Sequence, residues 1–246
     1  MEEHPLVWAH GLCSSIAHED ELGLVPISAL AEVMPVVRYD ARGHGSSIGG
    51  YQERVYRWSA MVDDMLRAYE GTFVAGGTGM GVATAMYAAL RAPRRVAALV
   101  LVLPPAAWEA RASATASYEA DADLAEMSGA RRLVEEVRRR PLSPLLAQVR
   151  SDAREVDARH LQAMDPKLLA PVLRAAARSD LPRPDEVRSI IVPTLLLAWE
   201  DDPAHPVATA QALADSMVQS DLRIAKDVSD IKAWPVVVEE FLADAM

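Results

Sequence analysis

The sequence predicts an α/β fold, in which a doubly wound, mostly parallel sheet carries an inserted all-helical lid. Two observations support this prediction. Short apolar runs alternate with amphipathic stretches in both outer parts of the chain, and this alternation stops between Pro104 and about Arg188. A chain of 246 residues that is 51% hydrophobic is long enough for one large core and an insertion.

Six runs are predicted to be strands. They are nearly all apolar rather than alternating, which is the pattern of a sheet covered on both faces. The helical stretches between them imply right-handed crossovers and therefore parallel neighbours. The expected strands are residues 5–9, 34–39, 72–76, 95–103, 190–198 and 221–225.

Amphipathic helices are expected between these strands. In one of them Trp58, Val62 and Met65 recur at helical spacing, a second begins at Pro206, and the last begins at Pro235. The lid is expected to contain helices over residues 106–127, 130–139, 144–161 and 166–178. Residues 1–105 and 189–246 would then form the core, and residues 106–188 the lid above the carboxyl edge of the sheet, where α/β folds bind ligands.

Composition narrows the choice of partner. The net charge of −10 and the isoelectric point of about 5.1 disfavour binding to nucleic acid or to anionic membranes. Cys13 is the single cysteine, and the longest apolar run, residues 96–103, is too short to cross a bilayer. We expect a cytoplasmic protein that binds a small molecule and uses no cofactor or metal. The sequence leaves the oligomeric state open.

Four short segments follow predicted strands in a characteristic order. They are His10-Gly11-Leu12, residues 40–46 (DARGHGS), residues 77–81 (GTGMG) and residues 202–206 (DPAHP). Together they resemble the motifs of the α/β-hydrolase family. The resemblance implies that fold, an oxyanion hole made by the N–H groups of Leu12 and Met80, and Asp202 at the position of the catalytic acid.

The third segment departs from the family at its central position. The family pattern is G-x-S-x-G, whereas this chain has Gly79 in the place of the serine. A shifted register would make Thr78 the nucleophile, but it would put Met80 where a small residue is required. Glycine suits the apex because the positive φ of that turn costs about 1–3 kcal/mol for a residue with a Cβ.

The expected position of the catalytic histidine also differs. In the family this histidine lies between the last strand and the final helix, but residues 228–235 contain none, and Asp230 is nearest to that position. If Asp202 and Asp230 converge, their repulsion would raise one pKa and give a general acid or base; alternatively, both are solvated or paired with arginines. His205 either replaces the missing base or packs or caps at a helix start. We interpret His10 and His44 as structural turn residues.

Two classes of function follow from the resemblance. One is an enzyme that acts on a small apolar carbonyl compound without an acyl-enzyme intermediate: a lyase, cyclase, isomerase or non-covalent hydrolase. The other is a ligand-binding pseudoenzyme. A weaker alternative is a hydrolase with a non-standard nucleophile, or an inactivated variant. His10, Trp108 and Trp199 would line the pocket, although Trp199 suits the core equally well.

The absent serine gives an expectation about reactivity. The protein should neither hydrolyse p-nitrophenyl esters nor react with fluorophosphonates. Gly79→Ser alone should restore little activity if no base is in place, and recovery would mean that His205 or another histidine serves as the base.

Overall fold

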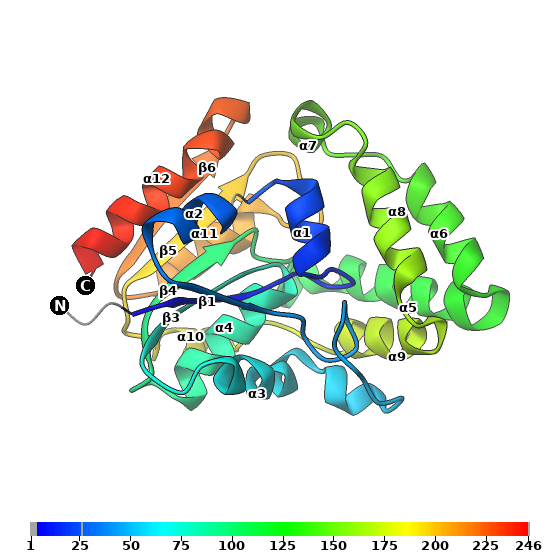
Figure 1. Ribbon diagram of the computed structural model, residues 1–246, viewed down its shortest axis with the longest axis horizontal. Helices are drawn as coiled ribbons and strands as arrows, with labels where there is room; N and C mark the ends of the chain where they lie inside the picture. Colours follow the sequence, from blue (N-terminus) through cyan, green and yellow to red (C-terminus); the bar gives the residue numbers. More distant parts are fainter. Residues whose placement is uncertain (1–3, 26, 246) are drawn as a thin grey trace.

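The computed structural model describes residues 4–25 and 27–245, and it confirms the predicted fold class. Six strands form one sheet in the order β2-β1-β3-β4-β5-β6, and every neighbouring pair is parallel (Figure 1). Their bounds are β1 (Leu6–Ala9), β2 (Val36–Tyr39), β3 (Phe73–Thr78), β4 (Val96–Val102), β5 (Thr194–Trp199) and β6 (Ser220–Ala225).

Helices cover both faces of the sheet, because alternate strand residues point in opposite directions. In β3, Phe73 and Ala75 join the core beneath α3 and α4, while Val74 joins the core shared with α2 and α12. The helices of these layers and their short connecting helices are α1 (Ile16–Leu22), α2 (Ile27–Val33), η1 (Glu53–Tyr56), α3 (Trp58–Ala68), α4 (Met80–Arg91), η2 (Trp108–Ala110), α10 (Pro184–Val187), α11 (Val207–Ser216) and α12 (Val228–Ala245).

The helical insertion lies at one end of the molecule, on the right in Figure 1. It has its own apolar cluster, which includes Leu133, Leu161 and Leu173 from three different helices. The predicted helix over residues 144–161 is two helices, because Arg150 leaves the helical region with φ −147° and ψ 85°. The helices of the insertion are α5 (Arg111–Ser128), α6 (Ala130–Arg139), α7 (Pro144–Val149), α8 (Ala153–Ala163) and α9 (Pro166–Ala177).

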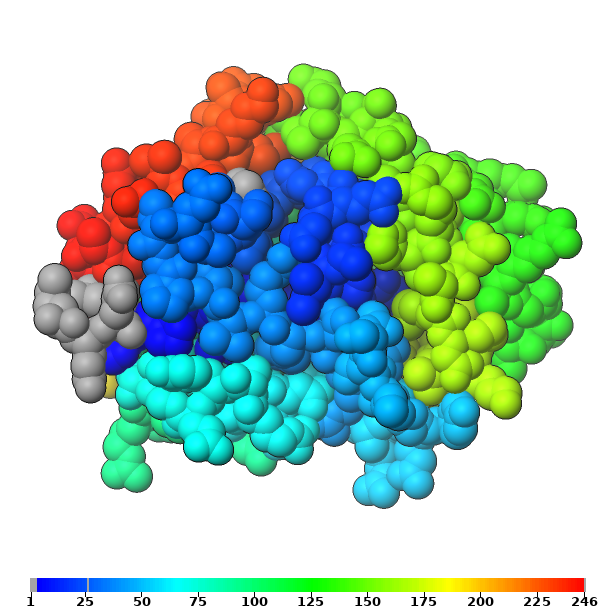
Figure 2. Space-filling view, in the orientation of Figure 1, coloured from blue at the N-terminus to red at the C-terminus, as the bar shows by residue number. Residues whose placement is uncertain are grey.

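The lid closes against the core at α1. Figure 2 shows its lime-green residues lying against the dark-blue residues of that helix. Polar pairs cross this boundary: His160 Nε2 lies 2.8 Å from Glu21 Oε2, and Arg159 pairs with the same carboxylate. At α1 the lid is therefore joined to the core by charged and polar side chains, whereas Leu168 and Val172 of α9 belong to the main apolar core.

The last helix begins earlier than its sequence predicts. We expected it to start at Pro235, but α12 starts at Val228 and contains that proline. Asp227 explains the difference, since its Oδ1 accepts hydrogen bonds from the N–H groups of Ser229 and Asp230, at 2.8 and 3.1 Å. Within the residues that the structure describes, no helix is long and apolar enough to cross a bilayer.

The strand-to-helix elbow between β3 and α4 packs tightly against the end of β1. A Cβ on Gly81 would lie 2.0 Å from the Ala9 carbonyl oxygen, and a Cβ on Gly77 would lie 2.4 Å from the same atom. These distances are far below van der Waals contact, so both positions require glycine.

We expect Gly81→Ala to destabilise the protein by roughly 1–3 kcal/mol or more, because the backbone of β1 would have to move away from the elbow. Urea unfolding followed by circular dichroism measures the change. Gly50→Ala is the matched control, since a Cβ there meets nothing within 4 Å. Equal unfolding midpoints for the two variants would show that the close approach does not constrain the fold.

Candidate active site

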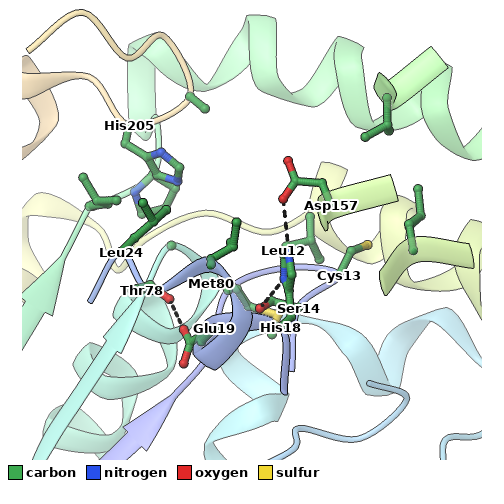
Figure 3. Close-up of a pocket in the computed structure, with 18 of the residues that line it drawn as sticks. Leu12, Cys13, Ser14, His18, Glu19, Leu24, Thr78, Met80, Asp157 and His205 are labelled. Carbon is green, nitrogen blue, oxygen red and sulfur yellow. Dashed lines mark hydrogen bonds and ion pairs between the residues drawn. The ribbon is translucent and has the colours of Figure 1, made fainter. Parts of the chain in front are cut away.

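A cavity of about 360 Å³ lies between the carboxyl ends of the central strands and the lid. This is the size range of small-molecule sites, and most of its walls are apolar. Figure 3 shows His205 on one side and His18 with Asp157 on the other. The cavity is lined by Gly11, Leu12, Cys13, Ser14, His18, Glu19, Leu22, Leu24, Val25, Trp58, Thr78, Gly79, Met80, Leu103, Pro105, Tyr118, Asp121, Leu133, Val137, Arg140, Arg154, Asp157, Leu161, Ala204 and His205.

Gly79 occupies the apex of the elbow, with φ 52° and ψ −108°. Thr78 is the last residue of β3, and its hydroxyl donates a hydrogen bond to Glu19 Oε1 at 2.7 Å. The shifted register, with Thr78 at the apex, is therefore wrong.

The two residues expected to form an oxyanion hole, Leu12 and Met80, line the cavity next to this apex. Leu12 follows β1, and Met80 is the first residue of α4, so the positive end of that helix faces the same place. Among the described residues, neither N–H donates a hydrogen bond within the chain. This arrangement suits a carbonyl oxygen that gains negative charge.

The loop after β5 directs a histidine at the elbow. The Nδ1 of His205 lies 2.9 Å from Asp202 Oδ2. Its other ring nitrogen, Nε2, lies 3.5 Å from the point that a Cβ on Gly79 would occupy. In the neutral imidazole, Nδ1 carries the ring proton and donates it in a hydrogen bond to the Asp202 carboxylate. Nε2 then has a lone pair, and this nitrogen lies on the side of the apex. From the sequence, His205 was either a replacement for the missing base or a residue that packs or caps at a helix start. This geometry supports the role of base.

Asp202 is held from several sides. Its carboxylate also accepts hydrogen bonds from Trp199 Nε1 at 2.9 Å and from the Ala204 N–H at 3.0 Å. Burial alone would raise the pKa of Asp202, but His205 and these donors outweigh burial and lower the pKa well below its usual range. The carboxylate is therefore charged and keeps the imidazole in one orientation.

The structure does not bring Asp230 to the cavity. This residue is exposed in the first turn of α12, where its Oδ2 accepts a hydrogen bond from the Lys226 N–H at 2.8 Å. The expected convergence of Asp202 and Asp230 is absent because the stretch we took for a loop is helical.

The three expected pocket residues also lie elsewhere. Trp108 Nε1 donates to the Pro182 carbonyl at 3.0 Å, outside the lining of the cavity. Trp199 is a core residue that stacks on Trp234, with ring centroids 6.0 Å apart. His10 is buried in the loop that follows β1, and its Nε2 accepts a hydrogen bond from the Ala41 N–H at 3.0 Å.

His10 and His44 are structural, as the sequence indicates. Their rings lie 5.2 Å apart and both are almost fully buried. The Nδ1 of His10 donates to the Gly11 carbonyl, and the Nδ1 of His44 to the Arg42 carbonyl. Burial lowers the pKa of His10, and it lowers the pKa of His44 to about 3. Two neutral imidazoles therefore support the loops that follow β1 and β2.

Sequence reasoning missed the polar side of the cavity. Glu19 is buried there, and burial raises its pKa against the effect of hydrogen bonds from Thr78 and Trp8. Ser14, His18 and Asp157 form a hydrogen-bonded chain. No local motif marks any of these residues, because Asp157 comes from the lid and the others from α1 and the loop before it.

Backbone strain concentrates around the cavity. Four non-glycine residues in the described ranges have positive φ, and two of them, Cys13 and Leu103, line the cavity. A third, Asp201, directly precedes Asp202. Strained conformations of this kind are typical of functional sites.

Each arginine that lines the cavity is paired with a carboxylate. Arg140 donates to Asp121 and Arg154 to Asp157, each at 2.9 Å. Both arginine side chains in the lining therefore already have a carboxylate partner. Within residues 4–25 and 27–245, no group of three or more His, Cys, Asp or Glu side chains is arranged to hold a metal ion.

The parallel sheet, the strand-to-helix elbow and the helical insertion together define the α/β-hydrolase fold. The chain belongs to the family described as serine aminopeptidase S33, whose model matches residues 5–226. No curated protein matches the sequence significantly.

Solved structures of similar fold are enzymes of several kinds. A hydrolase from Pseudomonas aeruginosa is 23% identical with a TM-score of 0.77, over 98% of this chain and 90% of that one. An enol-lactonase from Burkholderia xenovorans is 19% identical with a TM-score of 0.81, over 99% and 92%. A thermophilic esterase from Thermogutta terrifontis is 21% identical with a TM-score of 0.79, over 98% and 90%. At these identities the likeness concerns the fold.

The buried pair of histidines predicts how stability depends on pH. His44 has a pKa of about 3 when folded and about 6.5 when unfolded. Between these two pH values the unfolded chain binds more protons than the folded chain. The contribution of His44 to the free energy of unfolding is therefore complete above about pH 6.5. It falls as the pH drops, by up to about 1.4 kcal/mol per pH unit.

Urea unfolding at a series of pH values between neutral and pH 4 measures this slope. We expect His44→Asn to reduce it relative to the unsubstituted protein in the same buffers, since asparagine binds no proton in this range. An unchanged slope would contradict the assignment of a neutral, buried His44.

Proposed function

We propose that this chain binds a small, largely apolar carbonyl compound and transforms it by general acid–base catalysis, without an acyl-enzyme intermediate. The observation that carries the proposal is the position of the His205 imidazole. Its Nε2 faces the apex of the elbow, at 3.5 Å from the Cβ position of residue 79, and Asp202 lies behind Nδ1. A base is thus directed at a place where the chain itself offers no hydroxyl group.

In the proposed mechanism the carbonyl oxygen accepts hydrogen bonds from the N–H groups of Leu12 and Met80. His205 Nε2 then removes a proton from the carbon next to the carbonyl, or from a water molecule in the space above Gly79. A missing hydroxymethyl group leaves roughly the volume of one water molecule. The negative charge forms on the oxygen held by the two N–H groups, and Asp202 stabilises the imidazolium.

The imidazolium afterwards returns its proton to the product. It protonates a carbon in an isomerisation, and a departing oxygen in an elimination or a hydrolysis. The apolar walls and the paired arginines favour a ligand without net charge.

Other nucleophiles in the cavity are less suitable. Burial raises the pKa of Cys13 to about 12, so its thiol stays protonated at neutral pH. The hydroxyl of Thr78 is committed to Glu19.

A screen of uncharged carbonyl compounds, including enol lactones, enol esters and β-hydroxy ketones, tests the proposal. For a compound that is turned over, we expect His205→Gln to lower kcat/KM by roughly 10²–10⁴-fold, because the base is lost. Asp202→Asn should act in the same direction, since it disturbs the tautomer of the imidazole.

His4→Gln is the matched control, because His4 precedes β1 and lies at the end of that strand away from the cavity. Its kcat/KM should stay within about threefold of the starting value. An equal loss in both histidine variants would contradict a catalytic role for His205.

A ligand-binding protein without catalysis is the second candidate. Gly79 favours it, since the side chain that forms a covalent intermediate in serine hydrolases is absent. Tight binding of a carbonyl compound without turnover, equally strong in His205→Gln, would support this candidate against the first.

The elbow can be tested separately. From the sequence we expected Gly79→Ser to restore little activity. In the structure the imidazole of His205 lies within reach of the new hydroxyl group, so this expectation changes. We now expect Gly79→Ser to react with a fluorophosphonate at residue 79. We also expect it to hydrolyse p-nitrophenyl acetate at least about 10²-fold faster than the unsubstituted protein, a small part of the roughly 10⁶-fold that a triad serine contributes.

Gly79→Ala and the double variant Gly79→Ser with His205→Gln are the controls, and both should remain unlabelled, as should the unsubstituted protein. The positive φ will reduce the stability of each residue-79 variant by about 1–3 kcal/mol, so folding is checked by circular dichroism. A folded Gly79→Ser protein that stays unlabelled would show that His205 does not act as a base there.

A further inference from the structure

A second polar group lines the cavity, on the side away from His205. His18 Nδ1 lies 2.9 Å from Ser14 Oγ, and His18 Nε2 lies 3.1 Å from Asp157 Oδ1. Figure 3 shows this chain of three side chains, with Leu12 beside it and His205 across the cavity. The role proposed for His205 as a base does not involve these three side chains.

The carboxylate fixes the proton positions in this chain. Arg154 donates to the other oxygen of Asp157 at 2.9 Å, which favours the charged form of that carboxylate. A carboxylate only accepts hydrogen bonds, so the neutral imidazole of His18 carries its ring proton on Nε2. Nδ1 is then an acceptor, and the hydroxyl proton of Ser14 points to it.

Ser14 consequently presents only lone pairs to the cavity. Its side chain is not needed as a helix cap, since Ser15 Oγ accepts the His18 N–H at 3.1 Å. Its backbone N–H donates to the Gly11 carbonyl. The residue lines the cavity and is only 8% exposed, so its hydroxyl group is largely shielded from bulk water.

We infer that Ser14 Oγ accepts a hydrogen bond from a hydroxyl group of the ligand, and that the ligand of this cavity is a hydroxy-carbonyl compound. Its carbonyl group lies at the elbow and its hydroxyl group at Ser14, with the apolar residues between them holding the connecting carbons. An ether or carbonyl oxygen in the same place would meet the lone pairs of Ser14 and be disfavoured.

This inference rests on the proposed function only for the position of the carbonyl group. His18 and Asp157 are positioning residues, because they act through Ser14. Since Asp157 belongs to α8, the acceptor is in place only when the lid is closed on α1.

Isothermal titration with unreactive probes tests the inference. The probes are methyl ketones of increasing chain length with a terminal hydroxyl group, and their methyl ethers. At the length that fits, we expect the hydroxy ketone to bind about five- to tenfold more tightly than its ether. Ser14→Ala should remove this preference, whereas the matched control Ser113→Ala, on the exposed face of α5, should keep it.

His205→Gln separates the two proposals, because it should abolish turnover and leave the hydroxyl preference unchanged. Equal binding of hydroxy ketone and ether at every length, or a preference that survives Ser14→Ala, would overturn the inference. So would fluorophosphonate labelling of Ser14 in the unsubstituted protein, which would make this residue a nucleophile.

The proton position can be measured without any ligand. A long-range nitrogen-15 spectrum at neutral pH, with His18→Gln to assign the signal, should show His18 protonated at Nε2 and not at Nδ1. A proton on Nδ1, in the opposite tautomer or in an imidazolium, would turn the Ser14 hydroxyl proton toward the cavity and overturn the inference even if no ketone binds.

Discussion

The close contact between the end of β1 and the elbow is the constraint on which the site depends. Because Gly77 and Gly81 carry no side chain, the Ala9 carbonyl approaches the elbow backbone directly. The chain after Ala9 therefore passes beside the start of α4, and the N–H groups of Leu12 and Met80 face the same cavity. No side chain at residue 79 is needed for this arrangement, and the proposed function uses it to stabilise negative charge on a carbonyl oxygen.

The fold was predictable because it depends on patterns that local sequence contains. Continuous apolar runs indicated the strands, and the break in alternation indicated the helical insertion. Glycine spacing located the elbow, and the positive φ of Gly79 agrees with the choice of glycine there. Helix boundaries were less accurate, since a single capping residue, Asp227, extended α12 over a stretch that we had expected to be a loop.

The site was only partly predictable, because its remaining members meet through tertiary packing. Asp202 was identified from its loop, and the loop also contained His205, but nothing in the sequence showed which way that imidazole points. The orientation follows from the turn in which the His205 N–H donates to the Asp202 carbonyl. Asp157 could not have been linked to His18 from sequence, because the lid brings together residues that are far apart in the chain.

The stacking of Trp199 on Trp234 has a consequence for the carboxyl-terminal helix. Trp199 donates its indole proton to Asp202, and its ring is held by a residue of α12. The orientation of the acid that supports His205 is thus set partly by an element on the outside of the sheet that makes no contact with the cavity. Loosening of α12 would detach the acid from its tryptophan while leaving the walls of the cavity unchanged.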